Sequence, residues 1–214
     1  MSDVRLASNW PKSRVDAALQ NENTSELVRF LSERYTERFF GPIECLKKTK
    51  GNEHGFGFAI MALCSLLIET IQCYREGLPS SYNRELAALK QLPTFAAADS
   101  RFKQFPGQVT LGDPFRSFFF NAKIQQFFPA VDGEEFYTKI RCGLLHQAQT
   151  KGQWRIIRKG SFWDSVKRSI NRDEFSSRLK ECFDKYLQEL QAKDWSEDEW
   201  KRASTKIYWL AEVS

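Results

Sequence analysis

The chain has 214 residues, of which 42% are hydrophobic and 28% are charged, and its net charge is +5. This apolar content supports a folded core and excludes a wholly disordered protein. The five Cys residues form no CxxC pair, which argues against a zinc site or a disulfide framework. Residues 1–10 have no apolar core, so we expect no signal peptide, and no apolar run reaches the roughly 18–20 residues that a bilayer span needs. We therefore expect a cytoplasmic protein with no membrane segment.

Helix signals dominate the first half of the sequence. Asn23 with Glu26 three residues later resembles a capping box and predicts a helix that begins there. Residues 56–76 predict a helix that is apolar on nearly every side, as expected for the buried axis of a bundle. Further along, the pattern predicts a short helix over 82–92 and a loop over 94–114.

The second half continues with helices. Apolar spacing predicts one helix over 115–128 and another from Asp132 to about 149, the latter with acidic residues at its positive end. Two more helices are predicted to begin at the cap residues Asn171 and Ser196.

One segment of the second half has β character instead. Residues 153–158 and 161–166 are rich in β-type side chains and flank a Lys-Gly turn, which predicts a hairpin. The predicted fold class is therefore mainly all-α, a helical bundle with a small β-hairpin insertion near residues 153–166. We expect a single domain over 1–214, with residues 1–22 as an N-terminal arm and 153–170 as a basic hairpin appendage.

Positive charge is concentrated between Lys139 and Arg172. This window holds nine basic residues and one acidic residue, so it carries +8 while the rest of the chain carries −3. It also contains three aromatic residues, Trp154, Phe162 and Trp163. Basic and aromatic side chains together are typical of surfaces that bind single-stranded nucleic acid. The predicted RNA contacts are Lys151, Arg155, Arg158 and Lys159; the alternative is a solvated hairpin whose tryptophans pack inward.

Arg141 and His146 form the candidate catalytic pair in this window. In a straight α-helix, residues five apart lie about 140° apart, so convergence needs a long side chain and a distorted helix, which Gly143 would permit. His146 could move a proton to or from a ribose 2′-hydroxyl or a leaving 5′-oxygen. Arg141 could hold the phosphate. This chemistry predicts RNA as the substrate and needs neither metal nor cofactor.

The segment from Arg141 to His146 resembles the R-x(4–6)-H motif of the HEPN superfamily. The resemblance implies a helical bundle that forms a homodimer, with two motifs in one composite cleft. It also implies a metal-independent endoribonuclease of a toxin–antitoxin or antiviral defence system, and hence an antitoxin or defence-system partner protein. Two positions depart from the family pattern: Cys142 follows the motif Arg, and Ala148 replaces a Tyr found in some toxins.

Two further residues are candidates for supporting the catalytic pair. Glu69 is a carboxylate within an apolar run and is expected to orient Arg141, unless it forms an ordinary structural ion pair or is exposed. Gln147 follows His146 directly. Two alternatives to the enzyme remain open: a catalytically inactive module that binds RNA, nucleotide or a partner protein, and a purely helical assembly protein.

Overall fold

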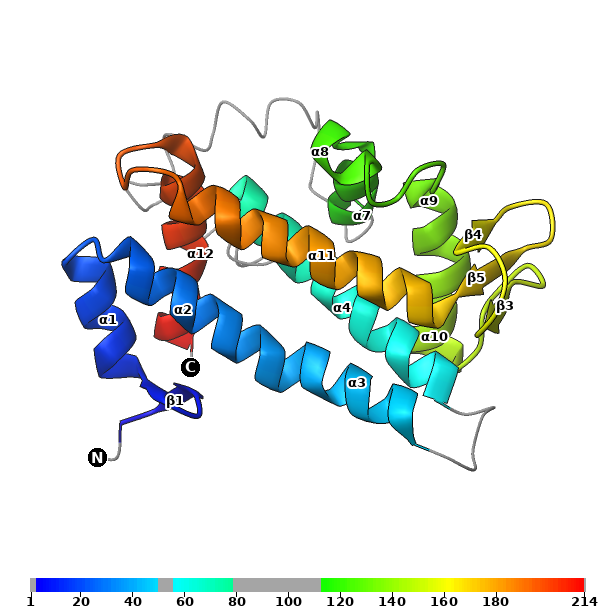
Figure 1. Ribbon diagram of the computed structural model, residues 1–214, viewed down its shortest axis with the longest axis horizontal. Coiled ribbons are helices and arrows are strands. Elements are labelled where there is room, and N and C mark those ends of the chain that lie inside the picture. Colours follow the sequence, from blue (N-terminus) through cyan, green and yellow to red (C-terminus); the bar gives the residue numbers. More distant parts are fainter. Residues whose placement is uncertain (1–2, 50–55, 79–112, 214) are drawn as a thin grey trace. The chain divides into compact units, whose positions relative to one another are not determined.

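The computed structural model describes residues 3–49, 56–78 and 113–213 (Figure 1). Helices account for most of these residues and strands are short, so the mainly all-α fold class is confirmed. The helix predicted over 82–92 and most of the loop predicted over 94–114 lie outside the described residues.

The elements of the described ranges follow in chain order, with η denoting π-helical segments. They are β1 (Arg5–Ala7), β2 (Trp10–Pro11), α1 (Lys12–Gln20), α2 (Thr24–Tyr35), η1 (Thr36–Phe40), α3 (Gly41–Lys48), α4 (Phe56–Glu76), α7 (Asp113–Phe120), α8 (Ala122–Gln125), α9 (Gly133–Glu135), η2 (Phe136–Arg141), α10 (Cys142–Gln147), β3 (Arg155–Ile157), β4 (Trp163–Asp164), β5 (Ser169–Asn171), α11 (Arg172–Gln191) and α12 (Asp198–Val213).

The described residues divide into two compact units. The first unit contains residues 3–37, 70–78 and 185–213. The second contains residues 38–49, 56–69 and 113–184. Helices α4 and α11 contribute residues to both units, and every candidate site residue belongs to the second.

The N-terminal segment belongs to the core of the first unit, whereas residues 1–22 were predicted to form an arm. β1 and β2 pair antiparallel and lead directly into α1. Trp10 and Val15 are fully buried, and the Trp10 indole N–H donates to Glu33 Oε2 at 2.7 Å. The Arg14 guanidinium lies 3.8 Å from the centre of the Trp10 ring. A buried indole with a satisfied N–H stabilises the packing of this segment on α2.

Aromatic side chains form the core of the second unit. The Phe128 and Phe175 ring centres are 5.0 Å apart, and Phe136 stacks on Phe175 at 5.3 Å with an interplanar angle of 8°. The rings of the whole aromatic cluster come from α7, η2, α11 and the segment after α8. Burial of such rings gives a large hydrophobic stabilisation, which accounts for the high Phe content. The buried phenylalanines of this cluster are Phe115, Phe118, Phe119, Phe128, Phe136 and Phe175.

Helix α4 has the bounds that the sequence predicted, and Gly77 follows it with a φ of +69°. It is the one helix among the described residues that is long and apolar enough, by length and composition alone, to cross a membrane. More than half of its most apolar stretch is buried within the protein, with Ile60, Cys64 and Leu67 fully inaccessible. This burial is typical of the core helix of a folded domain.

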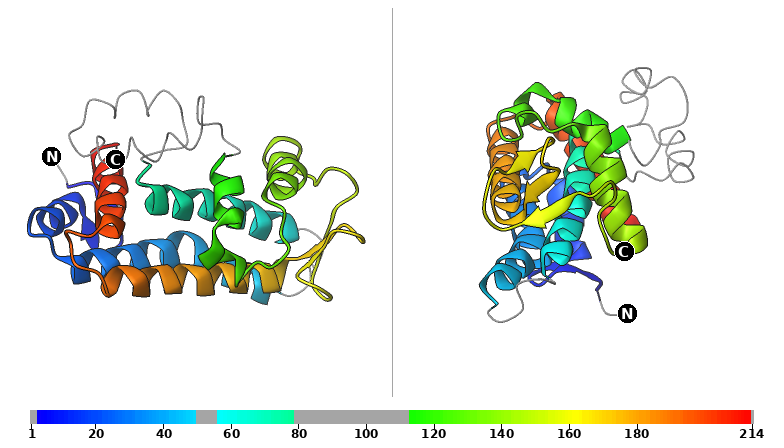
Figure 2. Two further views of the ribbon diagram at one scale, coloured as in Figure 1. Left: turned by 90° about the horizontal axis from the view of Figure 1, so that it is seen from above. Right: turned by 90° about the vertical axis from the view of Figure 1, so that its right-hand side faces the viewer.

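The small sheet differs from the predicted hairpin. β3 and β4 do not pair with each other; β5 lies between them, parallel to β3 and antiparallel to β4. The turn at Gly160 is present, with a φ of +113°, but only Trp163–Asp164 of the predicted returning strand forms β structure. β5 is thus the central strand; all three of its residues are buried, and it continues directly into α11 (Figure 2).

Candidate functional site

Arg141 lies in the helix that the sequence predicted from Asp132 to about residue 149. The Asp132 side chain caps this helix by accepting the Glu135 N–H at 2.8 Å. The helix is not regular, because Phe136–Arg141 is π-helical and only the following six residues return to α geometry. Such π segments widen the turn locally and occur frequently at functional sites. Arg141 is the last residue of the widened turn.

The Arg141 side chain points inward. It is 8% exposed and donates from Nη2 to Glu69 Oε2 at 3.5 Å. Its guanidinium carbon lies 5.6 Å from the ring centre of Tyr137 and 5.8 Å from that of Phe115. Two ring faces and one carboxylate therefore stabilise its charge in a partly dehydrated setting. Its Nε has no hydrogen bond within the described part of the chain.

Tyr137 remains protonated beside Arg141. The pKa of its hydroxyl is raised, first by burial and then by a hydrogen bond with the Cys142 side chain. Cys142 therefore contacts the tyrosine that lies beneath the guanidinium. A neutral phenol keeps the ring available for the cation–π contact without adding a second negative charge to that of Glu69.

His146 lies in α10, whereas Arg141 is the residue directly before that helix. His146 is exposed, as is Gln147, whereas Arg141 is buried. No hydrogen bond or ion pair joins Arg141 to either of these residues, all of which the structure describes. The two residues differ in exposure, and the change from π to α geometry falls between them, at Cys142. Within one copy of the chain, Arg141 therefore contacts Glu69, and no hydrogen bond joins the described Arg141 and His146 side chains.

The tryptophans of the basic window are part of the core. Trp154 and Trp163 are 4% and 8% exposed, and their ring centres are 4.3 Å apart. The Trp154 indole N–H donates to Glu135 Oε1 at 3.3 Å. The Arg178 guanidinium covers Phe162 at 4.2 Å. These contacts correct the expectation of a base-stacking surface. Packing the tryptophan rings on one another removes their apolar surface from water, which is more favourable than leaving the rings exposed to solvent.

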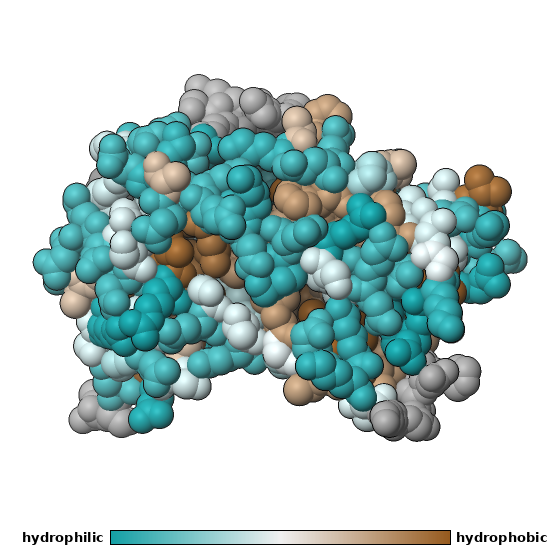
Figure 3. All heavy atoms as spheres, in the orientation of Figure 1, coloured by the Kyte–Doolittle hydropathy of each residue, from teal (hydrophilic) through white to brown (hydrophobic). Residues whose placement is uncertain are grey.

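The predicted RNA-contacting side chains remain at the surface. Arg155, Arg158 and Lys159 are exposed and Lys151 is half-buried. Arg158 forms an ion pair with Asp173 at 3.5 Å. The face over the three strands is mainly hydrophilic (Figure 3). The segment therefore offers positive charge to a ligand, without exposed tryptophan rings.

Sequence reasoning did not identify three residues that shape this unit. Tyr137 stands four residues before Arg141, a helical spacing that already placed the two on one face. Phe115 comes from α7 and carries no local signal of its contact with Arg141. Arg172 was counted as one more basic residue, but its side chain is 3% exposed.

No cluster of three or more His, Cys, Asp or Glu suited to a metal ion occurs in the described ranges. Comparison with known proteins gives no significant match to a family model, a curated protein or a solved structure. Any assignment of function therefore depends on the residues themselves.

Proposed function

We propose that this protein is a HEPN-type endoribonuclease that cleaves RNA without a metal, in a defence or toxin–antitoxin system. The observation that carries the proposal is the environment of Arg141. This buried guanidinium lies on two aromatic rings, is held by one carboxylate at 3.5 Å, and ends a π-helical turn five residues before an exposed His146.

Arg141 is suited to stabilise a phosphate. Its contact with Glu69 is long and uses Nη2 only, so a phosphate oxygen could accept hydrogen bonds from the remaining donors. The rings of Phe115 and Tyr137 fix the plane of the guanidinium, which reduces the conformational entropy lost on binding. The negative charge that develops on the phosphate would be stabilised in a site of low polarity.

His146 supplies the group that can transfer protons near neutral pH. The neutral imidazole accepts the proton of the ribose 2′-hydroxyl, whose oxygen attacks the adjacent phosphorus. The imidazolium formed in this way gives the proton to the 5′-oxygen, which leaves as a hydroxyl when its bond to phosphorus breaks. Because His146 is exposed and forms no hydrogen bond with the buried Arg141 of its own chain, the complete site would combine His146 of one copy with Arg141 of a second copy in a homodimer.

The same separation favours one alternative, an inactive HEPN-like module that binds RNA, nucleotide or a partner protein. Such a module would use the exposed Arg155 and Lys159 and would not need Arg141 and His146 to meet. The two functions differ in one measurable respect, which is whether bound RNA is cleaved.

The test is cleavage of single-stranded RNA by the purified protein in excess EDTA. We expect products that end in a 2′,3′-cyclic phosphate, and no cleavage of RNA carrying a 2′-deoxy substitution at the scissile nucleotide. His146→Ala and Arg141→Ala should each lower the rate at least about a hundredfold, the usual contribution of general acid–base catalysis. Arg29→Ala, which removes an exposed arginine paired with Glu33, serves as the control and should leave the rate unchanged.

Strict dependence on magnesium, or full activity of His146→Ala, would show that the chemistry lies elsewhere. Saturable RNA binding by the wild-type protein without cleavage would establish the binding module instead.

A further inference from the structure

The start of α11 contains a buried arginine with an unused hydrogen-bond donor. Arg172 is 3% exposed, and its buried Nε donor has no hydrogen-bond acceptor within the described residues. Its one charged contact is an ion pair of 3.4 Å between Nε and Asp173 Oδ1. By contrast, the buried Arg34 donates to the carbonyl oxygen of Leu6. A buried donor without an acceptor is costly, which indicates a missing acceptor at this place.

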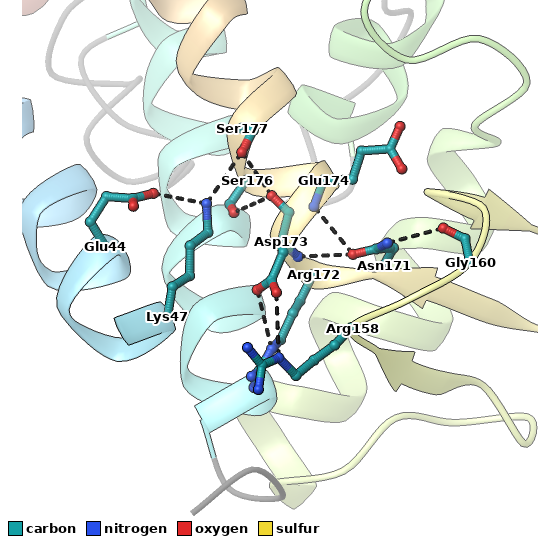
Figure 4. Close-up of polar contacts among 10 residues, drawn as sticks. All are labelled: Glu44, Lys47, Arg158, Gly160, Asn171, Arg172, Asp173, Glu174, Ser176 and Ser177. Carbon is teal, nitrogen blue, oxygen red and sulfur yellow. Dashed lines mark hydrogen bonds and ion pairs between the residues drawn. The ribbon is translucent and has the colours of Figure 1, made fainter. Parts of the chain in front are cut away.

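Asp173, the acid beside Arg172, is shared with a second arginine. Arg158 Nε lies 3.5 Å from Asp173 Oδ2, so one carboxylate contacts two guanidinium groups (Figure 4). The neighbouring Lys47 already contacts Glu44 at 2.8 Å and Ser177 at 3.3 Å. Arg158 and Asp173 have 42% and 31% exposed side chains, so the cluster opens to solvent on their side.

The Arg172 guanidinium also lies against the first turn of α4. A Cβ at Gly57, the second residue of that helix, would stand 3.2 Å from Arg172 Nη1 and 2.9 Å from Ile156 Cγ2. Gly57 thus permits this close approach. The N-terminus of a helix carries partial positive charge, so a guanidinium beside it is repelled and both groups favour an anion between them.

We propose that Arg172, Arg158 and the first turn of α4 form a binding site for a phosphate group. Guanidinium groups bind phosphate oxygens through paired hydrogen bonds, and helix N-termini bind the same group through backbone N–H donors. In the unbound protein the Asp173 carboxylate is the resident anion, and phosphate competes with it for the two arginines. The site uses none of Arg141, Glu69 or His146, so it stands independently of the proposed cleavage.

Inorganic phosphate is the probe for this site. In a titration followed by phosphorus NMR and by thermal unfolding at constant ionic strength, we expect saturable binding and a rise in Tm that chloride does not produce. Arg158→Gln should weaken binding about tenfold or more, because a charge-assisted hydrogen bond is lost. Arg168→Gln removes an equal charge from an exposed side chain of the same basic window and should bind phosphate as the wild type does.

Asp173→Asn separates a binding site from a merely structural ion pair. The substitution keeps the shape of the side chain but removes the competing charge. We therefore expect a lower Tm in phosphate-free buffer, recovery of that Tm by phosphate, and tighter phosphate binding than in the wild type. Adenosine 5′-monophosphate and an RNA dinucleotide lacking a terminal phosphate distinguish the source: preferential binding of the first assigns the site to terminal phosphates, and of the second to the RNA backbone.

Three results would overturn the proposal. They are no saturation by phosphate at tens of millimolar, an equal loss of affinity in Arg158→Gln and Arg168→Gln, and a destabilised Asp173→Asn protein that phosphate does not restore. None of these measurements depends on RNA cleavage, so the site and the enzymatic activity can fail separately.

Discussion

Gly143 allows the chain to fold back over the helix that carries Arg141. A Cβ at this position would overlap the carbonyl oxygen of Gln149 and stand 3.1 Å from the backbone nitrogen of Lys151. The returning segment is held by the Lys151 N–H, which donates to the carbonyl oxygen of Lys139 at 2.8 Å. From the sequence, Gly143 was expected to loosen the helix. In the structure it provides room for a second stretch of backbone.

Gly143→Ala should therefore destabilise the protein, although alanine is ordinarily the better helix former. Because the obstructing atoms are backbone, relief requires movement of the 149–151 segment, and we expect a loss of about 1–3 kcal/mol in the free energy of unfolding. Chemical denaturation monitored by circular dichroism measures this loss. Glu181→Ala, on the exposed face of α11, controls for placing alanine in a helix. Unchanged or increased stability of Gly143→Ala would contradict the close approach.

At the scale of elements, Asn171 joins the sheet to α11. Its Oδ1 accepts the N–H groups of Asp173 and Glu174 at 3.1 and 3.2 Å, and its Nδ2 donates to the carbonyl oxygen of Gly160 at 3.0 Å. One side chain therefore caps the helix and fastens the turn between β3 and β4 (Figure 4). The cap was predicted from the sequence, because it depends on residues three apart. The bond to Gly160 was not, because it joins residues eleven apart across a turn.

Asn171→Ala should lower the free energy of unfolding by about 1–2 kcal/mol, at the upper end of the range for helix caps, because the lost bonds are partly buried. Asn171→Asp should retain the cap but lose the donor to Gly160, and should fall between alanine and the wild type. Asn23→Ala removes a single exposed cap bond, from the Glu26 N–H, and is expected to cost less. Equal losses at positions 23 and 171 would mean that the Gly160 contact contributes nothing.

At the scale of the whole molecule, the separation of Arg141 from His146 determines how a ribonuclease site could be assembled. If the site combines the two residues from different copies, a mixed dimer of Arg141→Ala and His146→Ala chains contains one complete site. Random pairing makes half of the dimers mixed, so the mixture should recover about a quarter of the wild-type rate.

Unfolding and refolding the two variants together, followed by the EDTA cleavage assay, measures this recovery, and each variant refolded alone is the control. A mixture as inactive as its components would show that both residues act within one chain.

The sequence by itself determined the helix caps at Asn23 and Asn171, the bounds of α4 and the concentration of positive charge between Lys139 and Arg172. These features depend on side-chain periodicity, on contacts three or four residues apart, or on composition alone. Only the tertiary structure decided that β5 separates β3 from β4, that Trp154 and Trp163 pack on each other, and that Arg141 contacts Glu69. Each of these features depends on residues too far apart in sequence for a local pattern to pair them. Which of these residues pack together is decided by how much surface their packing buries.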